Sequence, residues 1–221
     1  MIIDVSAAIL LVGAGPVVKS ILSDSATISH VVVAADGGAQ TVLDLGMTPA
    51  AVIGDGDSLD ASSRNVIDPA IFHHITTQDT TDLEKSLANI RAPLIIGFGF
   101  LGGRLDHALA ALNALVKYRD SPILLIGEHD ACFHIPHDLQ IDLAPGTRFS
   151  VFPMSKARAR STGLVWPLDP HSFDPANQIG TSNRVSGAVH ITTEDFGLIG
   201  IIPPSAWRAA ARALWPAFPD R

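Results

Sequence analysis

Residues 93–126, PLIIGFGFLGGRLDHALAALNALVKYRDSPILLI, decide the fold class of this chain. The stretch begins with an apolar run, passes through a glycine-rich turn, and then carries apolar residues at helical spacing from Leu105 to about Tyr118. A second apolar run follows from Pro122 to Ile126. Parallel strands need a long crossover connection, which is usually a helix. A strand, a helix and a strand in this order therefore predict an α/β fold.

The same alternation extends back to the N-terminus. Apolar runs typical of buried strands recur between helical patterns, at Ala7–Val12, His30–Ala35 and Ala50–Ile53. A further helix is expected to begin at a capping box formed by Thr81 and Glu84, with Leu83, Leu87 and Ile90 on one face. We therefore expect an α/β domain with a mostly parallel sheet.

Beyond residue 138 the apolar pattern changes. Apolar residues now recur at alternate positions in short segments, at Leu139–Leu143, Phe149–Val151, Val189–Ile191 and Leu198–Ile202. This pattern predicts a small antiparallel β domain, so we expect two domains, residues 1–138 and 139–221. A loop is expected over residues 169–178, and a short helix that exposes Arg208 and Arg212 is expected after Pro204.

Composition and charge exclude several classes of protein. Of the 221 residues, 47% are apolar and 17% are charged, as in globular proteins. The net charge of -7 and the lack of a basic block argue against a nucleic-acid partner, because clustered cations hold phosphate backbones. The longest apolar stretch, Ala7 to Val18, is shorter than the ~20 residues of a membrane span, so no membrane partner is expected. A single cysteine, Cys132, excludes an internal disulfide and fits a cytoplasmic location.

The strongest chemical signal is the segment Gly54-Asp55-Gly56-Asp57-Ser58, directly after a predicted strand. Ligands of open α/β sheets bind at the carboxyl ends of strands. Residues two apart in extended backbone point to the same side, which lets Asp55 and Asp57 approach one cation. The alternative is an ordinary Asp/Gly turn whose side chains bind backbone amides.

A second polar cluster, Gln78-Asp79-Thr80-Thr81-Asp82, stands at the start of the capped helix. A helix N-terminus favours a phosphate, and Asp82 in the first turn could reach a metal that bridges this phosphate. The alternative is that these residues only cap the helix. Asp36 ends another predicted strand, where it could bind a ribose or substrate group or serve as an N-cap.

Two glycine-rich turns are weaker candidates. The turn from Gly97 to Gly103 leads to Arg104, whose planar guanidinium suits phosphate oxygens. The turn Gly13-Ala14-Gly15-Pro16 follows the first long apolar run. Neither turn is a Walker A sequence or a dinucleotide fingerprint, so each could equally be a plain connection between a strand and a helix. Together these segments indicate a magnesium-dependent enzyme that handles nucleotide phosphates.

Taken in order, the segments resemble the thiamine pyrophosphokinase family, which transfers diphosphate from ATP to thiamine. The resemblance covers most of residues 10–200 and includes seven matching stretches: Ala35-Asp36-Gly37-Gly38-Ala39, Asp44-Leu45-Gly46, Gly54-Asp55-Gly56-Asp57-Ser58, Gln78-Asp79-Thr80-Thr81-Asp82, Gly103-Arg104-Leu105-Asp106-His107, Thr162-Gly163-Leu164-Val165-Trp166-Pro167-Leu168 and Gly180-Thr181-Ser182-Asn183. This ordered set is far more specific than any of its members.

The resemblance implies a nucleotide-binding α/β domain followed by a β-sandwich, in a homodimer that binds ATP and thiamine. It implies a Mg²⁺ site formed by Asp55, Asp57 and Asp82. These three acids and Arg104 are the implied catalytic residues. The implied nucleotide site consists of Asp36, Gln78, Thr80, Thr81, Arg104 and Asp106. The implied thiamine site consists of Trp166, Ser182 and Asn183.

Two departures from the family pattern are visible. Gly56 stands where the family usually has an aromatic residue, and Val165 replaces a common basic residue. Neither change removes an expected ligand. Either Asp57 or Asp82 could accept the proton of the thiamine hydroxyl.

Three alternative functions remain at this point. They are diphosphate transfer to another hydroxymethyl heterocycle such as a pterin, a non-catalytic thiamine or nucleotide sensor, and a metal-dependent phosphohydrolase. The intact set of acids argues against the sensor, and the second domain with Trp166 argues for thiamine as the acceptor.

Overall fold

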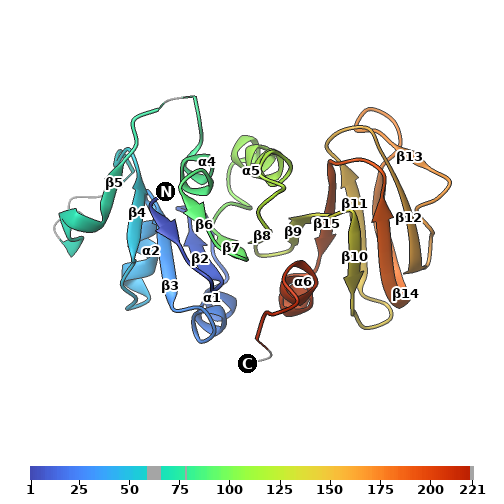
Figure 1. Cartoon of the computed structure of the whole chain (residues 1–221), viewed down its shortest axis with the longest axis horizontal. Coiled ribbons are helices and arrows are strands. Elements are labelled where there is room, and N and C mark those ends of the chain that lie inside the picture. Colours follow the sequence, from blue (N-terminus) through green and yellow to red (C-terminus); the bar gives the residue numbers. More distant parts are fainter. Residues whose placement is uncertain (59–65, 78, 220–221) are drawn as a thin grey trace. The chain divides into compact units, whose positions relative to one another are not determined.

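The structure is a computed structural model that describes residues 1–58, 66–77 and 79–219 (Figure 1). The chain forms two compact units. The first consists of Met1–Ala114 with Leu125–Glu128, and the second of Leu115–Leu124 with His129–Pro219. Among the described residues, no helix is both long and apolar enough to span a membrane.

The first unit is built on five strands in the order β7, β2, β3, β4, β5. Every pair of neighbours in this order is parallel. The strands are β2 (Ile9–Val12), β3 (Val31–Ala35), β4 (Ala51–Gly54), β5 (Phe72–His74) and β7 (Ile95–Phe98). All residues of β2, β4 and β7 are buried, which explains their continuous apolar runs. Strand β8 (Ile123–Ile126) is buried in the same way, and the short strands β1 (Ile3–Asp4) and β6 (Ile90–Arg91) pair with each other.

Helices connect these strands, as the crossover rule requires. They are α1 (Lys19–Ala26), α2 (Gly38–Asp44), α4 (Asp82–Leu87) and α5 (Leu105–Lys117), with a 3-10 turn η1 (Pro69–Ile71). Helix α2 packs on β2 and β3, and α4 packs on β3 and β4. The predicted helix after residue 79 is confirmed but is shorter than expected. Ile90 is not on its face, because the residue pairs with Ile3 in the small β1–β6 sheet and is buried there.

The second unit is antiparallel, as predicted. Its strands follow the order β13, β12, β14, β11, β15, β9, and β10 also pairs with β14. They are β9 (Ala131–His134), β10 (Asp138–Ile141), β11 (Arg148–Pro153), β12 (Ala157–Leu164), β13 (Ser172–Phe173), β14 (Gly180–Thr193) and β15 (Leu198–Ile202). The long strand β14 organises the unit, because Asn183 and Arg184 pair with β11 whereas its later residues pair with β10 and β12.

Three parts of the second unit differ from the expectation. Strand β12 was not predicted, because arginine and alanine alternate in it rather than large apolar residues. Strand β13 lies inside the predicted loop. The C-terminal helix α6 (Trp207–Leu214), which follows the turn η2 (Pro204–Ala206), is confirmed, but only Arg212 is exposed. The guanidinium of Arg208 instead lies 4.7 Å from the Trp207 ring centroid.

The strand pairing agrees with the predicted fold class in part. The pairs of the β7–β5 sheet are parallel and those of the second unit are antiparallel. Over the described residues of both units, the pairing is therefore mixed rather than mostly parallel.

Candidate active site

The two acids after β4 lie in a tight loop whose backbone is held by Asp36. Gly56, between the two acids, has φ +79°, a conformation that glycine adopts without strain. The Asp57 carboxylate accepts a hydrogen bond from Ser58 Oγ at 2.9 Å. Oxygens of Asp36, Asp55 and Asp57 lie within 4.8 Å of one another, which is close enough to approach one metal ion. The loop therefore brings together hard oxygen donors of the kind that Mg²⁺ prefers.

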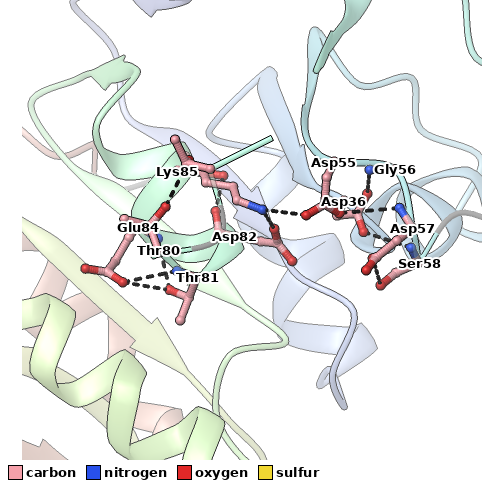
Figure 2. A network of polar contacts seen from close by, with 12 residues as sticks. Asp36, Asp55, Gly56, Asp57, Ser58, Thr80, Thr81, Asp82, Glu84 and Lys85 are labelled. Carbon is pink, nitrogen blue, oxygen red and sulfur yellow. Dashed lines mark hydrogen bonds and ion pairs between the residues drawn. The ribbon is translucent and has the colours of Figure 1, made fainter. Parts of the chain in front are cut away.

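Asp36, at the end of β3, is buried beneath this loop. Its side chain is hydrogen-bonded to the backbone N–H groups of Gly56 at 2.9 Å and Ser58 at 3.0 Å (Figure 2). Burial raises the pKa of Asp36, and these hydrogen bonds oppose the rise. The alternative role as a helix cap is wrong, because the N-cap of α2 is Gly37 and has no side-chain cap bond.

Lys85, which the sequence analysis missed, joins the acid loop to helix α4. Its ammonium group lies 2.8 Å from Asp55 Oδ2 and 3.0 Å from Asp82 Oδ1, and only 4% of its side chain is exposed (Figure 2). Burial lowers the pKa of Lys85, but the hydrogen bonds to the two carboxylates outweigh burial and raise it. The hydrogen bond from Lys85 in turn lowers the pKa of Asp55. Lys85 thus remains charged and bridges two of the three expected metal ligands.

The start of α4 is fixed by the predicted capping box. Thr81 Oγ1 accepts a hydrogen bond from the Glu84 N–H, and a Glu84 side-chain oxygen accepts one from the Thr81 N–H at 3.1 Å. The local prediction is therefore confirmed. Gln78, the first residue of the predicted cluster, lies outside the described residues.

The two glycine-rich turns pack directly against each other. Gly15 donates its N–H to the Gly99 carbonyl at 3.0 Å. Gly99 has φ +76°, and a Cβ there would lie 2.4 Å from the Gly13 carbonyl oxygen. Side chains at these positions would therefore push the two turns apart. The glycines allow both backbones to form one wall of a pocket.

Arg104 and Asp106, which follow the second turn, form a bidentate pair. Arg104 Nε lies 3.1 Å from Asp106 Oδ1 and its terminal nitrogen lies 2.6 Å from Oδ2. Hydrogen bonds from Arg104 hold the pKa of Asp106 at about 2. Both side chains are mostly exposed, so the pair orients the guanidinium without burying it.

These segments surround a pocket of about 510 Å³ at the carboxyl ends of the parallel strands. Of the expected site residues, those that line it are Asp55, Asp57, Thr80, Thr81, Asp82 and Arg104. Lys85, Gly13, Gly15 and Gly99 line it as well. Asp36 and Asp106 do not line the pocket. Asp36 is hydrogen-bonded to the loop amides, and Asp106 pairs with Arg104. The pocket combines carboxylates, a guanidinium, an ammonium and the backbone of the glycine-rich turns. This combination suits a metal-bound, phosphorylated ligand.

The three residues expected to face thiamine lie together in the second unit. Trp166 is 53% exposed and, with Asn183, lines a smaller pocket of about 250 Å³. Asn183 is only 5% exposed, and its amide accepts from the Trp166 N–H at 3.2 Å and donates to the Trp166 carbonyl at 2.6 Å. These two hydrogen bonds fix the backbone that carries Trp166. Ser182, the residue before Asn183, has φ +63° and donates its N–H to Ser150 Oγ.

The fold and the larger pocket define a class, namely an α/β protein with an acidic ligand site at the ends of parallel strands. The family model "Thiamin pyrophosphokinase, catalytic domain" matches residues 23–126, and "Thiamin pyrophosphokinase, vitamin B1 binding domain" matches residues 133–196. The chain belongs to the thiamine pyrophosphokinase family, whose members are ATP-dependent diphosphotransferases.

Individual relatives agree with the family models. The chain is 30% identical to thiamine pyrophosphokinase 1 of Oryza sativa subsp. japonica over 77% of both chains. It is 36% identical to thiamine pyrophosphokinase of Bacillus subtilis (strain 168), over 68% of this chain and 76% of the relative. The solved structure of thiamin pyrophosphokinase from Geobacillus thermodenitrificans is similar with a TM-score of 0.76 and 25% identity, over 89% of this chain and 97% of that one.

Proposed function

We propose that the pocket of the first unit is where this chain transfers diphosphate from ATP to the hydroxyl of thiamine, releasing AMP. The observation that carries the proposal is the convergence of Asp55, Asp57, Asp82 and Arg104 on one pocket at the carboxyl ends of parallel strands. These residues come from the loop after β4, the start of α4 and the turn before α5, and only the folded sheet assembles them.

We assign Asp55, Asp57 and Asp82 as the ligands of Mg²⁺. The donor set fits the ion, because carboxylate oxygens are its preferred protein ligands. Further support comes from Lys85, whose ammonium is a cation already seated between Asp55 and Asp82. When bound, Mg²⁺ supplies positive charge at the phosphoryl oxygens.

The chain's own residues bind and orient the triphosphate. Arg104 faces the pocket with its guanidinium fixed by Asp106, so it is placed to stabilise negative charge that develops on the transferred group. We place the nucleotide against Thr80, Thr81 and the two glycine turns, with Gln78 nearby in the sequence. Asp57 or Asp82 takes the proton of the thiamine hydroxyl, since both carboxylates line the pocket.

We assign Trp166, Ser182 and Asn183 to thiamine recognition. An exposed indole face attracts a cationic ring, and Trp166 provides one beside the smaller pocket. The Arg184 guanidinium lies 5.7 Å from the centroid of this ring. A positively charged thiamine ring therefore stacks on the face of Trp166 away from Arg184, because the two cations repel each other.

The roles of the two domains, the cellular location and the oligomeric state belong to the same proposal. We propose that residues 1–138 form the ATP-binding catalytic domain and residues 139–221 a β-sandwich that binds thiamine; the two family models match residues 23–126 and 133–196. We propose a cytoplasmic homodimer that binds neither nucleic acid nor membrane. Sedimentation of the purified chain tests the dimer.

The activity is tested with the purified protein, ATP, Mg²⁺ and thiamine, and mass spectrometry of the products. Thiamine diphosphate and AMP in equal amounts are expected. AMP without thiamine would indicate a phosphohydrolase, and transfer to a hydroxymethyl pterin in place of thiamine would indicate a different acceptor. Binding without any product would indicate a sensor.

A further inference from the structure

We propose that Asp36 is a positioning residue, which sets the shape of the Asp55–Ser58 loop before any metal ion arrives. The inference rests on the proposed function of this loop as a metal site. It replaces the sequence-based expectation that Asp36 contacts the nucleotide.

The contacts of Asp36 all support a positioning role. Its two carboxylate oxygens are hydrogen-bonded to different backbone groups, Oδ1 to the Gly56 N–H and Oδ2 to the Ser58 N–H (Figure 2). The two N–H groups alternate with Asp57 along the loop, and each follows one of the two acids. Fixing them constrains the backbone directly after Asp55 and on both sides of Asp57. Asp55 and Asp57 line the pocket, whereas Asp36 does not.

The backbone conformation and the neighbouring residues accommodate a buried carboxylate at Asp36. Only 1% of Asp36 is exposed, although it is an acid. Its φ of +42° lies in the left-handed region, which aspartate tolerates better than most side chains. Gly54, on the neighbouring strand β4, leaves room for it, since a Cβ at Gly54 would lie 2.6 Å from the Asp36 Cβ. A buried carboxylate requires compensating hydrogen bonds, and the loop amides provide them.

A positioning role differs from direct metal ligation in what it predicts without metal. An Asp36 oxygen lies within 4.8 Å of oxygens of Asp55 and Asp57, so direct ligation is the main rival. A ligand acts only when the ion is present. A positioning residue already protects the two loop amides in the metal-free protein.

The experiment measures amide hydrogen exchange at Gly56 and Ser58 in the full chain with chelator present. In the wild type both amides are expected to exchange slowly. In Asp36→Asn they should exchange about tenfold faster or more, because the charged acceptor is lost. The matched control is Asp44→Asn, which removes the same charge from the exposed end of α2 and should leave both rates unchanged. Mn²⁺ titration should then show weaker binding to Asp36→Asn and unchanged binding to the control.

A second variant tests the proposal independently, in case Asp36→Asn does not fold. Gly54→Ala keeps every charge but forces the Asp36 side chain to shift, so it should also speed exchange at both amides. Unprotected loop amides in the metal-free wild type, or exchange that is unchanged in folded Asp36→Asn, would overturn the proposal. Weaker ATP binding by Asp36→Asn with unchanged Mn²⁺ affinity would also overturn it in favour of a nucleotide contact. None of these outcomes depends on thiamine turnover, so they are independent of the proposed activity.

Discussion

Replacing Lys85 by methionine removes the ammonium that joins the acid loop to helix α4 but keeps most of the buried aliphatic chain. Two charge-assisted hydrogen bonds are lost, to Asp55 at 2.8 Å and to Asp82 at 3.0 Å. The Asp55 side chain is 18% exposed and the Asp82 side chain 39% exposed, so solvent screens the second bond more than the first. A hydrogen bond to a charged group stabilises by about 1.5–3 kcal/mol, and an exposed ion pair by at most about 1 kcal/mol.

We therefore expect Lys85→Met to lower the free energy of unfolding of the metal-free protein by about 2–3 kcal/mol. For a chain of this size, that change lowers Tm by about 4–12 °C. Added Mg²⁺ should recover part of the loss, because the bound ion then neutralises the two carboxylates that have lost the Lys85 ammonium. Calorimetry with chelator and with Mg²⁺ measures both effects.

The matched control is Lys19→Met, which removes an exposed lysine at the start of α1 and should change Tm little in either condition. An unchanged Tm for Lys85→Met in chelator would refute the reasoning. Equal losses with and without Mg²⁺ would place the effect in packing rather than in the charge of the site.

Four further predictions test the two units separately. Asp57→Asn should strongly lower kcat without lowering Tm, because it removes an anionic ligand; normal turnover at limiting Mg²⁺ would exclude it from the metal site. Arg104→Lys should lower kcat/KM, because an ammonium cannot reproduce the planar fork; unchanged kinetics would make the arginine structural. Trp166→Ala should raise the KM for thiamine about tenfold and leave the KM for ATP unchanged, whereas a matched rise in both would place the tryptophan in the scaffold. Burial lowers the pKa of His134 to about 4, so the unfolded chain binds a proton more readily and the second unit should lose stability as pH falls from about 6.5 to 4. His134→Gln should weaken this dependence in calorimetry, and an identical pH profile would contradict the assignment.

Contacts between residues close in sequence were predictable. The capping box of α4 joins Thr81 to Glu84, three residues apart, and its geometry depends only on local backbone. The fully buried strands were recognised because both of their faces are covered, which makes their apolar runs continuous. Strand β12 escaped prediction because arginines on its exposed face hide the alternation.

The positions of Asp55 and Asp57 after a strand followed from the sequence, but their partners did not. Lys85 binds Asp55 from 30 residues away, and the Asp36 carboxylate binds the Gly56 amide from 20 residues away. Nothing in the local pattern marked Lys85, which reads as an ordinary helical lysine. A signal was available in hindsight, since Lys85 stands three residues after Asp82 and thus on the same side of the helix.

The sequence by itself determined the two kinds of strand pairing, the ends of the strands where the acids stand, and the family to which the chain is similar. These features depend on apolar periodicity and on short motifs, which the linear order of residues records. Only the tertiary structure decided that Asp36 holds the acid loop, that Lys85 bridges Asp55 and Asp82, and that Asn183 fixes Trp166. Those contacts depend on which strands become neighbours and in what register, and that choice is made by burial of the whole sheet rather than by any local segment.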